Sequence, residues 1–281
     1  MRDPLKKQFI IFVGPTLLAF LIAFAIPLVL GIYLSFTEFT TVTDAVFIGL
    51  ENYRTAFSDS SGFINALIFT VKFTIVSVVT INVFAFLLAL ALTRNVRGKN
   101  ILRTVFFMPN LIGGIVLGYI WQLIFNGILL PFGQTLTANA TYGFWGLIIL
   151  MNWQMIGYMM VIFIAGLSGI PTNIFEAARV DGAGPFRTLF SVTLPNMMPS
   201  ITICLFLTLT NSFKLFDQNL ALTAGAPANE TSMLSLDIYK TFYGRSGFEG
   251  VGQAKAVIFS ILVAAIALLQ LYFTRRREQE L

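Results

Sequence analysis

The stretch Ile170–Pro195, IPTNIFEAARVDGAGPFRTLFSVTLP, lies between two long apolar segments and yet carries charged side chains. Asn173 can cap a first short helix, and Glu176 stands three residues later, as in a capping box. Gly182 predicts the end of that helix, because glycine accepts the positive φ that is common just past a helix end. The stretch therefore predicts a short helix that projects from a membrane domain and ends in a hinge.

A second short helix is expected after the hinge. Pro185 suits its first turn, since proline has a fixed φ and no N–H to leave unpaired, and Pro195 is expected to end it. On the first helix, Ala177 and Ala178 are small enough to let another surface come close. One side of the second helix is expected to hold Phe186, Leu189, Phe190 and Thr193.

Composition indicates a membrane protein. Of the 281 residues, 57% are hydrophobic and only 11% are charged, whereas a soluble domain carries about 25% charged residues. The net charge of +5 comes from basic residues at the ends of apolar runs, which indicates anchoring and orientation rather than nucleic-acid binding. Cys204 is the only cysteine and histidine is absent, so a disulfide, a cysteine metal cluster and histidine chemistry within this chain are excluded.

Six apolar runs are long enough to cross a bilayer, which takes about 20 helical residues. The first run contains Ala23-Phe24-Ala25, which imitates a signal-peptide cleavage site, but it is far longer than the roughly 7–15 residues of a signal core. We therefore expect an all-α integral membrane protein with six transmembrane helices, at about residues 9–36, 66–93, 104–125, 144–168, 197–220 and 254–273.

Lysine and arginine predict the orientation of these helices. The N-terminus, the loop at 94–103, the stretch 170–195 and the C-terminal tail hold twelve of them, and the three opposite loops hold three. This excess predicts that both termini and the stretch 170–195 lie in the cytoplasm. The expected organisation is an N-terminal segment with the first helix and first external loop at 1–65, a core membrane domain at 66–275 and a cytoplasmic tail at 276–281.

The fixed positions of the stretch resemble a known motif. Glu176-Ala177-Ala178, then Gly182 after three residues, Val192 after nine more and Leu194-Pro195 after one fill every place of the EAA loop in ABC-importer membrane subunits. The resemblance implies a type I ABC-importer permease fold and a loop that docks on a cytoplasmic ATPase. An ordinary amphipathic loop is the competing interpretation. The implied coupling residues are Glu176, Ala177, Ala178, Asp181, Gly182, Leu194 and Pro195.

Nearly the whole chain resembles the sugar branch of that family, the larger membrane subunits of maltose and sn-glycerol-3-phosphate importers. Residues 65–70 resemble its NTLxFT and residues 165–171 its AGLxxIP. Phe216-Asp217, followed by 222–227, resembles its FD…LTxGGP, which implies a role for Phe216 and Asp217 in the outer gate region or its structure.

Polar and aromatic residues gather in the third, fourth and fifth predicted spans, and Gln154 is one of them. A sugar pathway needs this mixture, because aromatic faces cover the apolar side of a sugar ring while amides and hydroxyls bond its hydroxyl groups. The competing interpretation is that polar residues join helices while Trp and Tyr anchor at the interface. The predicted pathway residues are Tyr119, Gln122, Asn152, Trp153, Tyr158, Thr208, Asn211 and Ser212.

Few ionisable residues lie inside the predicted spans. Lys72 can extend its ammonium group toward the outer surface. Lys214 and Asp217 are three residues apart and could pair with each other. Lys214 and Lys255 also depart from the neutral or small residues that the resemblance would imply at their positions, so the substrate stays unnamed.

The sequence contains no phosphate-binding loop. Gly98-Lys99 is the only Gly-Lys pair, and Asn100 follows it where a Walker A loop needs Ser or Thr. We therefore expect no catalytic site, metal or cofactor in this chain, and ATP with Mg²⁺ in a partner ATPase. A membrane-embedded enzyme is disfavoured for want of histidine and paired carboxylates. The alternative function is an ion-coupled secondary carrier without an ATPase, for which Asp217 is the only candidate carboxylate.

The family resemblance also implies partners. They are a second homologous permease subunit that forms a heterodimer, a cytoplasmic ATPase dimer, an extracytoplasmic solute-binding protein, the lipid bilayer and a sugar, expected to be an oligosaccharide. The implied location is the cytoplasmic membrane of a bacterium or archaeon.

Overall fold

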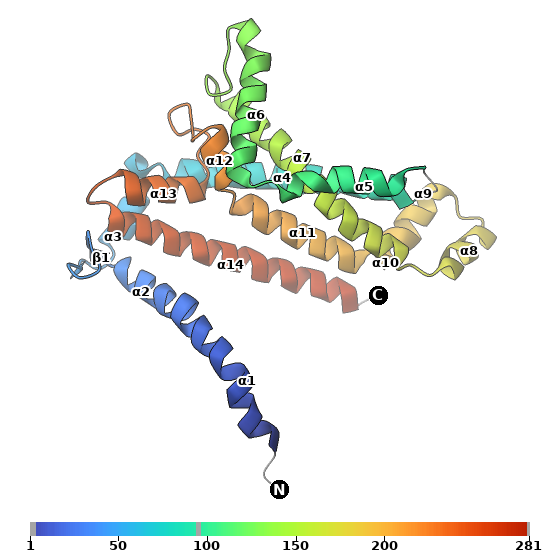
Figure 1. Cartoon of the computed structure of the whole chain (residues 1–281), viewed down its shortest axis with the longest axis horizontal. Helices are drawn as coiled ribbons and strands as arrows, with labels where there is room; N and C mark the ends of the chain where they lie inside the picture. Colours follow the sequence, from blue (N-terminus) through green and yellow to red (C-terminus); the bar gives the residue numbers. More distant parts are fainter. Residues whose placement is uncertain (1–3, 94–96, 280–281) are drawn as a thin grey trace. The chain divides into compact units, whose positions relative to one another are not determined.

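A computed structural model describes residues 4–93 and 97–279, and its ribbon is almost entirely helical (Figure 1). Within the described residues the strands form one short antiparallel pair, β1 (Thr37–Glu38) with β2 (Val46–Phe47). The predicted all-α class is therefore confirmed. The described residues divide into two compact units, one from Met1–Phe63 with Asp237–Ile261 and the other from Ile64–Leu236 with Leu262–Leu281.

The first unit begins with a long apolar helix. Here α1 (Pro4–Phe20) continues through a π turn, η1 (Leu21–Ala25), into α2 (Ile26–Leu34). The π turn immediately precedes the turn that contains Pro27, and its wider spacing accommodates a residue that cannot donate a ladder hydrogen bond. The other elements of this unit are α3 (Glu51–Ala56), the 3₁₀ turn η2 (Asp59–Ser61), most of α13 (Leu234–Gly244) and the first part of α14 (Glu249–Gln279).

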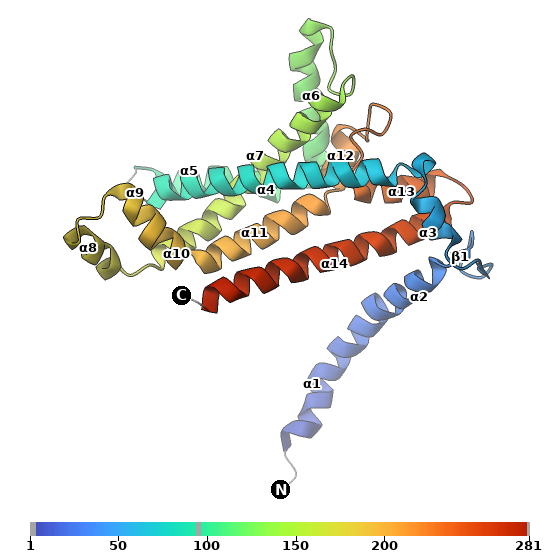
Figure 2. The ribbon, with the colours of Figure 1, turned by 180° about the vertical axis from the view of Figure 1, so that it is seen from behind.

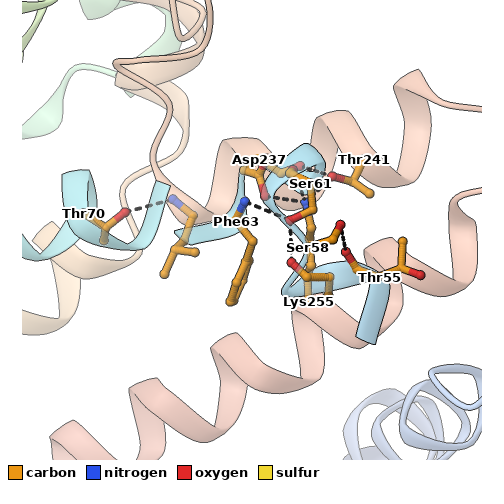
Figure 3. Close-up of polar contacts among 10 residues, drawn as sticks. Thr55, Ser58, Ser61, Phe63, Thr70, Asp237, Thr241 and Lys255 are labelled. Carbon is orange, nitrogen blue, oxygen red and sulfur yellow. Dashed lines mark hydrogen bonds and ion pairs between the residues drawn. The ribbon is translucent and has the colours of Figure 1, made fainter. Parts of the chain in front are cut away.

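A fully buried lysine joins three of these elements (Figure 3). The Lys255 ammonium on α14 donates to the Ser61 carbonyl at 2.9 Å and to Asp237 Oδ2 at 2.8 Å. Its third hydrogen bond goes to Thr241 Oγ1 at 2.9 Å. The Phe63 ring lies 5.9 Å from the same nitrogen. All three ammonium donors are used, which explains how an apolar helix carries this charge in its interior.

We expect removal of one partner of this ion pair to cost more than removal of both. Lys255→Met should lower the free energy of unfolding by about 3 kcal/mol or more, because Asp237, whose side chain is only 14% exposed, then loses the cation that it pairs with. The double variant Lys255→Met with Asp237→Leu should recover most of that loss. Unfolding of the purified chain in detergent measures both, and Lys72→Met, at an exposed lysine, is the matched control. Equal losses in the single and double variants would contradict this account.

The second unit holds most of the membrane-crossing helices. Its three central helices, α4, α7 and α11, lie side by side, and α12 lies toward the opposite end of the unit from α8 and α9 (Figure 2). Its elements are α4 (Phe63–Thr93), α5 (Lys99–Phe107), η3 (Met108–Leu111), α6 (Gly114–Leu129), η4 (Leu130–Phe132), α7 (Ala140–Ser168), α8 (Thr172–Val180), α9 (Pro185–Thr188), the π turn η5 (Leu189–Thr193), α10 (Leu194–Asn196), α11 (Met198–Phe213) and α12 (Asp217–Leu222).

Helix α7 is at the centre of the core of this unit. Its most apolar window is 61% buried, against at most 28% for the other candidate spans among the described residues. Its buried side chains include Leu147, Met151, Met155 and Met159, which pack with residues of α4 and α11 such as Phe73. A polar side chain that α7 directs into this core must therefore find its partner within the protein.

Three of the predicted spans have the wrong limits. The third, at 104–125, is broken by a 3₁₀ turn at Pro109, and the membrane-length helix is Gly114–Phe132. The fifth, at 197–220, is interrupted after Phe213 and resumes as α12, and the sixth begins at 249 rather than 254. Mean hydropathy does not register such breaks, because proline and short apolar turns leave it high.

The predicted number of six spans is the upper end of the range that the structure gives. Among the described residues five helices are long and apolar enough to cross a membrane, and a sixth span is counted if Pro185–Asn196 and Met198–Phe213 form one. Those two segments meet at an angle of 72°.

Candidate functional site

The first helix of the stretch 170–195 ends as the sequence predicts. Gly182 has φ +70°, and its N–H donates to the Arg179 carbonyl at 3.0 Å. The next N–H, of Ala183, donates to the Ala178 carbonyl at 2.9 Å. These two bonds form a Schellman motif, which satisfies carbonyls that the end of α8 would otherwise leave unpaired.

The start of the same helix differs from the prediction. Pro171, in extended conformation with ψ 136°, occupies the N-cap position, and α8 begins at Thr172. Asn173 therefore lies within the first turn instead of capping it, and the expected capping box with Glu176 is wrong. Proline fits the boundary because it cannot continue a helical hydrogen-bond ladder from the preceding segment.

The second helix begins as expected and ends later. Gly184 is its N-cap residue, with Pro185 in the first turn, but the helix continues past Pro195 to Asn196. A π turn makes this possible: the Leu194 N–H donates to the Leu189 carbonyl, five residues back. The wider turn relieves the clash that a proline ring makes with the preceding turn of an α-helix. Asn196 Nδ2 then donates to the Val192 carbonyl at 2.7 Å.

The exposed face of this two-helix element is both acidic and apolar. Glu176 and Ala177 are exposed, whereas Ala178 is only 8% exposed and packs inward, contrary to the expectation that both alanines face outward.

The predicted apolar side of the second helix is also wrong. Thr193 is buried, while Phe186 and Phe190 point outward, because the π turn changes the angular spacing of the residues. The large apolar side chains on this face are Val180, Phe186 and Phe190, which are 88%, 79% and 64% exposed.

A groove of about 670 Å³ lies between the element and the helices that carry it. Phe175 and Arg179 of α8 line one part of it, and Pro185, Phe186 and Leu189 line another. Between the two helices the chain turns at Gly182, so the shape of the hinge depends on the backbone conformation at this residue.

We expect Gly182→Val to destabilise the hinge by about 1 kcal/mol or more, because a β-branched residue is strained at positive φ. Gly182→Asn should cost less, since asparagine tolerates this conformation. Gly184→Ala, at φ −69°, is the matched control. Hydrogen exchange at the Ala183 amide reports the opening of the motif, and equal protection in the valine and asparagine variants would contradict the argument.

A second candidate site is a polar cavity of about 560 Å³ within the second unit. Four of the predicted pathway and gate residues line it, Tyr158, Asn211, Phe216 and Asp217. Tyr158 is further positioned by Phe107, whose ring centre lies 6.2 Å from its own. The remaining lining residues are Asn110, Met151, Gln154, Met155, Lys214, Leu215 and Gln218.

Two of the other predicted pathway residues join helices. Asn152 Nδ2 on α7 donates to Thr80 Oγ1 on α4 at 2.9 Å. Thr208 on α11 is fully buried and accepts from Asn82 Nδ2 on α4, also at 2.9 Å. Ser212 is buried too, and its hydroxyl has no hydrogen-bond partner among the described residues. These contacts fit the competing interpretation of polar residues that hold helices together.

The last three predicted pathway residues lie on or near α6. Tyr119 is 55% exposed, and Trp153 is 44% exposed with its ring against Trp121, at 5.6 Å between centres. Gln122 Nε2 donates to the Leu222 carbonyl at 2.9 Å, at the end of α12. The structure therefore does not bring these three to the cavity, and their part in a pathway stays a prediction.

Helix α12 forms part of the cavity wall because α6 holds it closely. A Cβ on Gly114 would lie 2.8 Å from Asp217 Cβ, and one on Gly118 would lie 2.6 Å from Ala221 Cβ. Only glycine permits this approach, as in the small-residue contacts that join membrane helices. Gln122 follows at the same four-residue interval and bonds the far end of α12.

The cavity carries one group of each charge. Lys214 and Asp217 both line it and both are exposed, but no ion pair joins these two residues, so the expected pairing is wrong. The cause is local, because α11 ends at Phe213 and α12 begins at Asp217. The two side chains therefore do not have the spacing of neighbours on one helix.

Residues 81–279 match the family described as the binding-protein-dependent transport system inner membrane component, and the chain belongs to this family. It is therefore a multi-pass membrane component of a transport system and not a catalytic subunit. The predicted family is confirmed, and nothing among the similar proteins supports the alternative of an ion-coupled carrier.

The relatives extend over almost the full length of the chain. The probable starch degradation products transport system permease protein AmyD of Thermoanaerobacterium thermosulfurigenes is 46% identical, over 96% of this chain and 95% of its own. The multiple sugar-binding transport system permease protein MsmF of Streptococcus mutans is 32% identical, over 91% of each chain.

A solved structure shows the same fold. It is a crystal structure of a bacterial ABC transporter involved in the import of the acidic polysaccharide alginate, with a TM-score of 0.80 and 20% identity over 96% of each chain. At this identity the likeness concerns the fold alone.

Proposed function

We propose that this chain is a membrane-spanning subunit of an ATP-driven ABC importer and forms half of the pathway for a sugar, an oligosaccharide, delivered by a solute-binding protein. The observation that carries the proposal is the two-helix element at 172–196, which exposes both Glu176 and three large apolar side chains, Val180, Phe186 and Phe190. A membrane protein that only faces lipid and water has no need of such a face. Relatives named for starch products and multiple sugars support a sugar as the substrate.

The energy source lies in other chains under this proposal. A cytoplasmic ATPase dimer binds ATP and Mg²⁺, docks on the face that contains Glu176 and Phe186, and transmits its closure to α11 through the 72° bend after Asn196. A second homologous permease completes the pathway as a heterodimer. The distribution of lysine and arginine supports placing both termini and this element in the cytoplasm.

The polar cavity supplies the chemistry that a sugar requires. Asn110, Gln154, Asn211 and Gln218 each offer an amide, which both donates and accepts hydrogen bonds, as sugar hydroxyls also do. Tyr158 adds an aromatic face and a hydroxyl. Ligand cavities are typically about 300–1,000 Å³, and the observed 560 Å³ lies within that range.

We expect Glu176→Lys to uncouple transport. The charge reversal places a cation on the docking face, so uptake should fall by at least about 10-fold while the membrane helices stay folded, as loss of a close charged contact predicts. Uptake by the reconstituted complex and copurification of the ATPase are the measurements. Glu230→Lys, at an exposed acid in the loop after α12, is the control. Wild-type uptake together with normal ATPase copurification by Glu176→Lys would refute this role of the element.

We expect Tyr158→Ala and Asn211→Ala each to raise the KM for sugar about 5-fold or more, because each removes about one net hydrogen bond to the substrate. Basal ATP hydrolysis by the assembled complex should persist. Tyr142→Ala, at a tyrosine of the same helix outside the cavity, is the matched control.

The sugar itself can be found by a screen of uptake with the purified binding protein and a series of neutral and acidic oligosaccharides. Normal assembly and wild-type kinetics in both cavity variants, for every sugar taken up, would place the pathway elsewhere.

A further inference from the structure

A hydrogen bond joins two glutamine side chains that line the polar cavity. Gln218 Nε2, on α12, donates to Gln154 Oε1, on α7, at 2.7 Å. Gln154 lies in the middle of an apolar helix and is only 7% exposed, so its polar amide is buried. Both side chains line the cavity, so a solute in this cavity would meet the bond.

The direction of this bond is fixed by its surroundings. Gln154 Nε2 donates to the backbone carbonyl of Ile112 at 3.3 Å. A carbonyl can only accept, so the nitrogen of Gln154 must face Ile112 and its oxygen must face Gln218. One buried amide thereby links three segments: α7, the turn before α6, and α12.

Helix α12, which carries Gln218, packs closely against α6. The glycines of α6 bring the two backbones together, and Gln122 bonds the end of α12. In the cavity wall the Gln218–Gln154 bond joins α12 to α7. Breaking this bond removes that polar link and leaves the close contact between α6 and α12 in place.

We infer that the Gln154–Gln218 hydrogen bond is a latch that holds the cavity closed on its α12 side, and that a hydroxylated, uncharged solute opens it by taking over both amides. This inference rests on the proposed function for its substrate class. To replace the bond, a ligand must donate to Gln154 Oε1 and accept from Gln218 Nε2 at the same time. Neighbouring sugar hydroxyls can do both, whereas a simple cation or anion can do only one.

The charges of the cavity agree with an uncharged solute. Lys214 and Asp217 line the same cavity and are both exposed, so one positive and one negative charge face its contents. An acidic sugar would gain from the first and be repelled by the second. A neutral sugar can use both as hydrogen-bonding groups.

The first test measures access to the cavity and does not depend on transport. Met155, which lines the cavity and is 6% exposed, is replaced by cysteine in a Cys204→Ser chain, and the assembled complex is labelled in right-side-out vesicles with a membrane-impermeant thiol reagent. Gln218→Met, which cannot bond Gln154, and Gln218→Asn, which is one methylene too short, should each label about 5-fold faster, the factor expected for loss of one net hydrogen bond. Gln134→Met, at an exposed glutamine outside the cavity, should label at the original rate.

The second test uses the sugar that the uptake screen identifies. Gln218→Asn keeps an amide for the sugar but loses the latch, so its KM should fall, because a larger fraction of the protein is already open. Gln218→Met loses both and should show no such fall. Only variants that elute as the intact complex in size-exclusion chromatography are compared. This control separates the effects on labelling and KM from misfolding.

Equal labelling rates in wild type, Gln218→Met and Gln218→Asn would overturn the latch. A rise in labelling together with a higher KM in Gln218→Asn would overturn its opening by the substrate. If labelling rises but the wild-type complex transports no sugar, the proposed function fails, and with it the substrate class of the latch, while the closure itself stands.

Discussion

Inside a bilayer every backbone N–H and C=O must find its partner within the protein, because hydrocarbon offers none. The second unit nevertheless interrupts its helices repeatedly, and side-chain amides supply bonds at the interruptions. Gln122 donates to the Leu222 carbonyl where α12 ends. Asn126 accepts from the Leu136 N–H in the turn that follows α6. In the loop after α12, the Asn219 side chain donates to the Thr231 carbonyl and accepts from the Met233 N–H. At these three places an amide side chain supplies the hydrogen bond that the interrupted backbone lacks.

This requirement explains why polar residues in the spans cannot be sorted by residue type alone. Asn152 and Gln154 are two residues apart on α7, and both are amides in an apolar helix. Asn152 bonds Thr80 on α4 and belongs to the packing between helices. Gln154 satisfies the Ile112 carbonyl and also faces the cavity. Because the two positions differ by about 200° around a helix, their neighbours and tasks differ completely.

What the sequence predicted well is local chemistry. The positive φ of Gly182 and the helix start at Pro185 depend only on their own backbone, so both were predictable. The predicted helix limits were wrong where tertiary packing determines the end of a helix, as at the break around Pro109. The cavity was half predicted: Tyr158 was chosen for its aromatic ring, whereas Gln218 gave no signal, since its part depends on α12 folding back against α6. No periodic pattern in the sequence predicts that α12 folds back against α6.

The π turn before Pro195 has a consequence for the spacing of the motif. Such a turn contains one residue more than an α turn, so the interval from Gly182 to Leu194-Pro195 includes one residue that the helix absorbs as a bulge. Loss of a single residue between 189 and 193 would convert the bulge into an ordinary α turn. The ring of Pro195 would then clash with the preceding turn, a clash that the wider turn avoids. The length of this interval and the proline at its end therefore depend on each other.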